Sequence, residues 1–143
     1  MTLIECVPNF SEGRNKHTLG EIKNHLSQDS QIYLLGSESG ESVNRSVFTF
    51  VGEPENVIDA AYRAISVASE LIDMQKHKGV HPRIGACDVC PFIPLDRDPS
   101  SMEICIEASR KLAKKVGNDL KIPVFLYGES ASNTDRRELA SLR

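Results

Sequence analysis

The side chains best suited to chemistry are concentrated in residues 77–86, which read His-Lys-Gly-Val-His-Pro-Arg-Ile-Gly-Ala. This segment holds two imidazoles, His77 and His81, and two cations, Lys78 and Arg83. Histidine accepts and returns protons near neutral pH, and lysine and arginine bind carboxylates. The segment therefore predicts a proton-transfer site that binds anionic groups. From composition alone, the end of a helix with a glycine stop and favourable cations explains it equally well.

Metal binding is a weaker interpretation of the same region. His77 and His81 are four residues apart, and Cys87 and Cys90 complete a formal set of two histidines and two cysteines. However, a glycine and a proline interrupt any helix that would place both imidazoles on one face. In an extended segment, residues three apart point to opposite faces of a sheet, which disfavours redox use of the two cysteines. We therefore predict no metal site, and cysteines that are small buried side chains.

Two other polar segments follow predicted strands. One begins at Asn9, and either Ser11 or Asn15 in it can cap the next helix. The other runs from Glu38 to Arg45 and is equally consistent with a solvated hairpin. The sequence contains neither the glycine-rich phosphate loop G-x-x-x-x-G-K-[ST] nor the G-x-S-x-G of many serine hydrolases, so neither chemistry has support.

Alternating apolar runs and amphipathic stretches indicate the elements that position these segments. The expected strands are residues 3–7, 32–35, 46–51, 87–95 and 122–127. The expected helices are residues 19–26, 54–72 and 100–112, with a short one from about residue 134. Pro54 suits the first position of the second helix, and Ser100 with Glu103 fits a capping box for the third.

This order predicts an α+β fold in which helices cover one face of a mostly antiparallel sheet. A helix, a hairpin-like strand pair and a second helix are typical of the ferredoxin-like α/β sandwich. The 143 residues are enough for one domain, which we assign to residues 1–143.

Composition excludes several classes of partner. The formal net charge is −3, with 40% hydrophobic and 26% charged residues, so we expect no binding to nucleic acid or to an anionic membrane. The sequence contains no secretory signal pattern at its start and no stretch of about 20 apolar residues. We therefore expect a cytoplasmic protein with reduced cysteines.

Six segments together resemble the amino-terminal subdomain of the glutamate formimidoyltransferase family, found alone or fused to a cyclodeaminase. They are residues 5–13 (ECVPNFSEG), 44–52 (NRSVFTFVG), 71–74 (LIDM), 77–86 (HKGVHPRIGA), 88–94 (DVCPFIP) and 122–129 (IPVFLYGE). The match runs in order along nearly the whole chain. It implies a subdomain of ferredoxin-like topology, in agreement with the pattern of elements.

The resemblance implies transfer of the formimino group from N-formimino-L-glutamate to N5 of tetrahydrofolate, a step of histidine degradation. Tetrahydrofolate is then a co-substrate, and no metal is needed. The histidine directly before Pro-Arg in that family, here His81, donates and accepts protons. An aspartate that follows the second strand assists it, and Glu38 stands at that position here. The expected substrate-binding residues are Asn9, Arg45, Lys78 and Arg83.

In the family a second, similar subdomain follows, and the folate binds between the two halves. The resemblance therefore implies a partner for residues 1–143, either that carboxy-terminal subdomain or a second copy in a homodimer. The alternative function is a stand-alone, non-catalytic folate- or ligand-binding or assembly module of the same fold.

Overall fold

The computed structural model describes residues 2–28, 31–79 and 85–139. Their strands are β1 (Ile4–Cys6), β2 (Asn9–Phe10), β3 (Ile32–Gly40), β4 (Arg45–Gly52), β5 (Cys87–Val89) and β6 (Phe92–Pro94). Their α-helices are α1 (Lys16–Leu26), α2 (Pro54–Leu71) and α3 (Pro99–Lys115). Shorter helical turns are the π-helical η1 (Val116–Leu120) and the 3-10 turns η2 (Gly128–Ser130) and η3 (Thr134–Arg136). None of the helices in these ranges is long and apolar enough to span a bilayer.

All the strand pairs within the described ranges are antiparallel. β1 and β2 both pair with β4 in one continuous register, and they are separated only by Val7 and Pro8. β6 and β5 lie on their other side and are separated by Cys90 and Pro91. Both breaks contain a proline, which has no N–H for a ladder hydrogen bond. The six strands therefore form four rows across the sheet, in the order β3, β4, β1 with β2, and β6 with β5.

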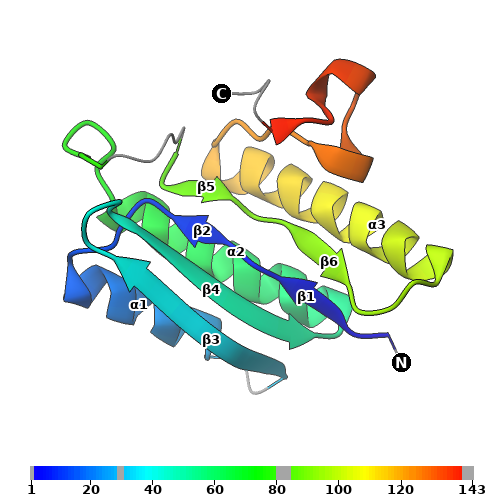
Figure 1. Ribbon diagram of the computed structural model, residues 1–143, viewed down its shortest axis with the longest axis horizontal. Helices are drawn as coiled ribbons and strands as arrows, with labels where there is room; N and C mark the ends of the chain where they lie inside the picture. Colours follow the sequence, from blue (N-terminus) through cyan, green and yellow to red (C-terminus); the bar gives the residue numbers. More distant parts are fainter. Residues whose placement is uncertain (1, 29–30, 80–84, 140–143) are drawn as a thin grey trace.

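The helices cover one face of this sheet and leave the other face open, which confirms the predicted α+β architecture (Figure 1). β4 buries Ser46, Phe48 and Phe50 toward the helices, while Val47 and Thr49 between them remain half-exposed on the open face. This alternation follows from the two-residue period of a strand. Phe10 and Phe48 meet edge to face with ring centroids 5.8 Å apart.

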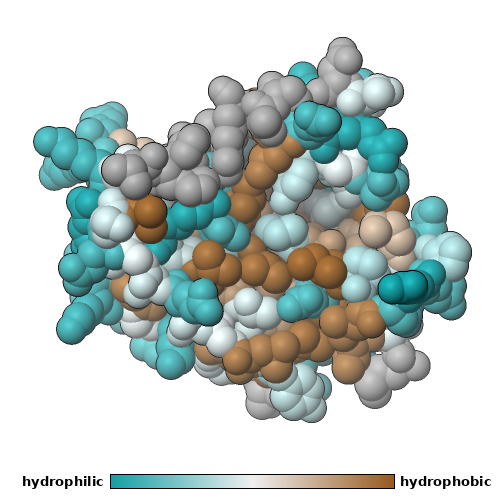
Figure 2. Space-filling view, viewed as in Figure 1, coloured by the Kyte–Doolittle hydropathy of each residue, from teal (hydrophilic) through white to brown (hydrophobic). Residues whose placement is uncertain are grey.

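The open face is the one turned toward the viewer in Figure 2, which shows apolar side chains gathered in bands along it. The exposed large hydrophobic side chains of this protein include Tyr33 on β3 and Ile93 on β6. These two lie in one row across the strands, because Tyr33 pairs with Val51, Val51 with Glu5, and Glu5 with Ile93.

Local signals set the helix starts, with one correction. Asn15, one of the two predicted candidates, caps α1 and accepts hydrogen bonds from the backbone of His17 and Thr18. Pro54 lies in the first turn of α2. The predicted capping box at residues 100–103 is wrong, because α3 begins earlier, with Asp98 as its cap and a proline after it.

Three further predictions about elements are corrected. β3 continues to Gly40, so most of the expected loop after residue 35 is strand, paired residue by residue with β4. Residues 122–127 form no strand. This segment instead lines a groove beside α3, and Pro123 lacks the N–H that pairing requires. The short helix expected from residue 134 is a single 3-10 turn.

Gly13 lies in the connection between β2 and α1, where this connection packs closely against the β3–β4 turn. A Cβ there would lie 2.2 Å from the carbonyl oxygen of Gly40 and 2.6 Å from the backbone nitrogen of Arg45. We expect Gly13→Ala to lower the free energy of unfolding by about 1–3 kcal/mol, the usual cost of overpacking. Urea denaturation measures the change.

Gly20 provides the matched control, because a Cβ on this helical glycine meets nothing within 4 Å. Gly20→Ala should raise the free energy of unfolding by about 0.5–1 kcal/mol, since alanine favours a helix interior. Equal effects of the two substitutions would contradict the close packing at Gly13.

Candidate functional site

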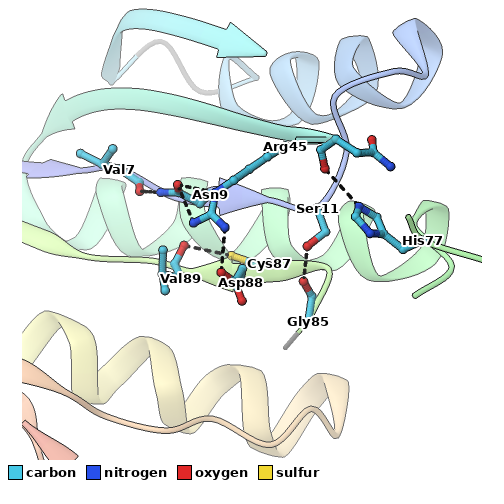
Figure 3. A network of polar contacts seen from close by, with 10 residues as sticks. Val7, Asn9, Ser11, Arg45, His77, Gly85, Cys87, Asp88 and Val89 are labelled. Atoms are coloured by element: carbon cyan, nitrogen blue, oxygen red, sulfur yellow. Dashed lines mark hydrogen bonds and ion pairs between the residues drawn. The ribbon is translucent and has the colours of Figure 1, made fainter. Parts of the chain in front are cut away.

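A mostly buried arginine, Arg45, is the centre of the polar network at one end of the sheet (Figure 3). Nη1 of Arg45 donates to Oδ2 of Asp88 over 3.0 Å. Nε and Nη2 of Arg45 donate to Oδ1 of Asn9 over 3.1 and 3.0 Å. The side chain of Asp88 is fully buried and that of Arg45 is 12% exposed. Burial at this level requires such pairing, because an isolated charge would lose its hydration without compensation.

Three separate strands bring this cluster together. Asn9 is on β2, Arg45 begins β4, and Asp88 is the middle residue of β5. A β-bulge aims the carboxylate, because Asn9 pairs with Val89 while Phe10 pairs with Cys87, which leaves Asp88 as the extra residue. Bulges of this kind re-aim side chains beside functional sites. Asn9 is fixed in turn by its own Nδ2, which donates to the carbonyl of Val7 over 2.9 Å.

Glu38 lies on the same open face as Asn9. Glu38 pairs with Val47 across β3 and β4, and Val47 pairs with Asn9 across β4 and β2. Directly paired residues share a sheet face, and two strand spacings are about 10 Å. Glu38 is exposed, so its carboxylate is in contact with solvent at this end of the sheet.

The loop that carries the histidines is held on both sides of residues 80–84. On the amino-terminal side, Nδ2 of Asn44 donates to the carbonyl of Lys78 over 3.1 Å, and Nε2 of His77 donates to the carbonyl of Asn44 over 3.1 Å. On the carboxy-terminal side, Oγ of Ser11 donates to the carbonyl of Gly85 over 2.6 Å. The backbone of Ser11 also donates to Ala86, over 2.8 Å.

Asn44 links the loop to the rest of the site. It occupies a left-handed backbone conformation with φ 50°, which asparagine tolerates better than most residues. Its Oδ1 accepts from the backbone N–H of Gly13 over 2.8 Å. One buried side chain thus joins the β3–β4 turn, the β2–α1 connection and the histidine loop.

The structure brings some predicted site residues together. Asn9 and Arg45 are in direct contact, and Glu38 shares their sheet face. Lys78 is exposed, and its backbone is held beside the same turn. The remaining two, His81 and Arg83, lie outside the described residues.

Sequence reasoning missed Asp88, Asn44 and the anchoring role of Ser11. Asp88 did carry a signal, since it is an acidic residue inside an apolar run predicted as a strand. Such a side chain needs a buried partner of opposite charge. Among the described residues, no group of three His, Cys, Asp or Glu side chains is arranged to hold a metal ion.

Comparison with known proteins decides the family. The model of the formiminotransferase domain, N-terminal subdomain, matches residues 3–143. The chain belongs to this family. In this formiminotransferase subdomain, the polar site joins three segments that are far apart in the sequence. They contain Asn9, Arg45 and Asp88.

Full-length relatives extend well beyond this subdomain. A formimidoyltransferase-cyclodeaminase of Mus musculus is 48% identical over 99% of this chain, which covers 26% of the mouse protein. A glutamate formimidoyltransferase of Thermoplasma acidophilum is 46% identical over the whole chain, which covers 46% of that protein. One from Streptococcus pyogenes is 43% identical, with 99% of this chain and 46% of the relative covered. The chain thus spans less than half the length of these curated relatives.

Removal of Asp88 tests whether the ion pair supports the site. In Asp88→Ala the Arg45 guanidinium loses its charged partner, and we expect the free energy of unfolding to fall by roughly 3–5 kcal/mol. Urea denaturation followed by circular dichroism measures this loss.

Asp59 on α2 serves as the control, because its carboxylate is 52% exposed and lies 3.5 Å from Nζ of Lys115. Asp59→Ala should cost less than about 1 kcal/mol, as exposed ion pairs generally do. A cost for Asp88→Ala no greater than that for Asp59→Ala would show that the buried pair does not support the fold.

Proposed function

We propose that this chain is the amino-terminal half of a formimidoyltransferase site that moves the formimino group of N-formimino-L-glutamate to N5 of tetrahydrofolate. One observation carries the proposal: segments matched by the family model converge on a single polar site at one end of the open sheet face. Relatives named glutamate formimidoyltransferase, 43–46% identical over at least 99% of the chain, support the same reaction. Their names specify glutamate and the formimidoyl group, and tetrahydrofolate is the acceptor we assign.

The chemistry requires a group that both takes and returns a proton. Attack of the folate N5 on the formimino carbon gives a tetrahedral intermediate, from which the attacking amine must lose a proton. The glutamate nitrogen must gain a proton before the carbon–nitrogen bond to it breaks. We assign both transfers to His81, because an imidazole performs them in sequence near neutral pH.

The anchored flanks of residues 80–84 support this assignment. Hydrogen bonds from Asn44 and Ser11 hold the flanking residues Lys78 and Gly85 beside the polar cluster. Attachment of both flanks limits the entropy that ordering the segment between them would cost.

Glu38 is the proposed partner of that imidazole. A carboxylate orients the ring and stabilises its cation, an effect worth about 10²-fold or more in rate. Its place on the open face, in the row that contains Asn9, is consistent with this role. It has one more methylene than the aspartate of the family pattern.

The substrates carry carboxylates, and the cations of the site are their proposed ligands. We assign Lys78 and Arg83 to direct binding, with Lys78 already exposed. Arg45 is mostly buried, and several of its N–H groups serve Asp88 and Asn9. We therefore propose that Arg45 holds Asn9 in position to contact the substrate. Its positive charge also raises the electrostatic potential of the site without direct contact with the substrate.

A second body must complete the folate site in this proposal. More than half of the Thermoplasma acidophilum relative lies outside the matched part, and a carboxy-terminal subdomain of such a protein is the proposed partner. A second copy of this chain is the other candidate. Transfer by the chain alone would favour the second copy, and transfer only after addition of the subdomain would favour the subdomain.

Replacement of His81 tests the proposal. Formimino transfer is measured for this chain alone and after mixing with the carboxy-terminal remainder of the Thermoplasma acidophilum relative. We expect His81→Ala to lower turnover by at least about 10²-fold, the usual contribution of a proton-transferring side chain. Circular dichroism should remain that of the parent chain.

His25→Ala is the matched control, because this half-buried imidazole lies on α1 and bonds the carbonyl of Glu21. It should retain full turnover. Unchanged transfer by His81→Ala would contradict the shuttle. Absence of transfer by the parent chain, even with the added subdomain, would favour the non-catalytic ligand-binding or assembly module.

A further inference from the structure

Three cysteines meet where β1 faces the junction of β5 and β6. Sγ of Cys6 lies 3.5 Å from Sγ of Cys90. Cys87 also contacts Cys90, and its own thiol lies 3.6 Å from the carbonyl oxygen of Val89. All three are free thiols, and the proposed transfer reaction uses none of them.

Sheet register explains why thiols so distant in sequence are neighbours. Cys6 pairs with Phe92 across β1 and β6, and Cys90 lies two residues before Phe92. Residues related in this diagonal way share a face of the sheet, within reach of each other's side chains. The 3.5 Å separation of the two sulfur atoms must shorten by about 1.5 Å to form a disulfide of about 2 Å.

The β-bulge at Asp88 corrects the expectation that Cys87 and Cys90 point to opposite faces. With Phe10 paired to Cys87 and Asn9 to Val89, one residue is left out of the alternation. Cys87 and Cys90 consequently line the same groove. A regular strand would have separated them.

The three thiols differ in electrostatic environment. Hydrogen bonds from Cys6 and then from Cys87 hold the pKa of Cys90 well below its usual value. Burial, reinforced by Cys90, raises the pKa of Cys6, and the hydrogen bond to Cys90 raises that of Cys87. Cys90 is therefore the thiol of the cluster that ionises most readily, and the thiolate is the nucleophilic form.

Access to the cluster differs as well. A mainly apolar groove of about 470 Å³ lies between α3, the β5–β6 segment and residues 122–130. Cys90 is half-buried and contributes to its wall, whereas Cys6 is fully buried behind it. A small oxidant in the groove therefore reaches Cys90 without reaching Cys6, and Cys6 is the adjacent thiol that can resolve the product.

We propose that Cys90 and Cys6 form a peroxide-reactive thiol pair, in which Cys90 is oxidised first and Cys6 closes a reversible intrachain disulfide. This modification site is independent of the proposed transfer reaction. The oxidant is a hydroperoxide, and hydrogen peroxide is the probe.

The reaction balances in two steps. The Cys90 thiolate attacks one peroxide oxygen, the O–O bond breaks, and the leaving hydroxide takes a proton to become water, which leaves Cys90 as a sulfenic acid. The sulfur of Cys6 then attacks the Cys90 sulfur, the S–O bond breaks, and hydroxide departs as water with the Cys6 proton. Two electrons pass from the thiol pair to the peroxide, and a dithiol reductant restores both thiols.

The experiment treats the folded chain with stoichiometric hydrogen peroxide, blocks the remaining thiols with N-ethylmaleimide and maps peptides by mass spectrometry. We expect the free thiol count to fall from four to two, with a Cys6–Cys90 peptide as the predominant product. The same treatment in urea should lose this preference and favour Cys87–Cys90, because short loops close most readily.

Single substitutions separate the two roles. In Cys6→Ser the sulfenic acid on Cys90 should persist and be trapped by dimedone, whereas Cys90→Ser should give neither adduct nor disulfide. Cys105→Ser is the matched control, because this buried cysteine on α3 has its pKa raised by burial alone, and it should behave as the parent chain. A folded chain that keeps all four thiols, or that links Cys87 to Cys90 instead, would overturn the proposal.

Discussion

The ion pair between Arg45 and Asp88 is the interaction on which the arrangement of the site depends. Both charges lie within the sheet, so each requires the other as a hydrogen-bonded partner. Two further N–H groups of the guanidinium donate to Oδ1 of Asn9. The side chain of Asn9 is held in turn by its hydrogen bond to the carbonyl of Val7. A shift of any of the three strands by one residue would leave a buried charge unpaired. Strand register and site geometry are therefore set by the same contacts.

The open sheet face and the anchored loop are consequences of this arrangement. Because the helices cover only one face, residues that point away from the core line a surface available to a second body (Figure 1). Asn44 and Ser11 attach the histidine loop to the end of that surface. The same β-bulge that aims Asp88 at Arg45 turns Cys87 toward Cys90. One local irregularity thus serves both the polar site and the thiol cluster.

The sequence predicts the features that depend on near neighbours. Asn15 as one of two candidate caps, Pro54 at the start of α2 and the strand at residues 46–51 all follow from local rules, and the structure confirms them. Asp88 and its bulge depend on a cation 43 residues away, which periodicity cannot reveal. Residues 122–127 have the composition of a strand, but strand formation also requires a partner edge, and this segment packs beside α3 instead.

The proposed function requires that the surface around Asn9, Arg45 and Asn44 bind the substrates of formimino transfer. Amide NMR spectra of the isotope-labelled chain, titrated with N-formimino-L-glutamate and tetrahydrofolate, test it most directly. We expect chemical-shift changes concentrated at these residues and at Ser11 and Lys78. Shifts confined to the groove beside α3, or spectra unchanged at the polar site, would contradict it.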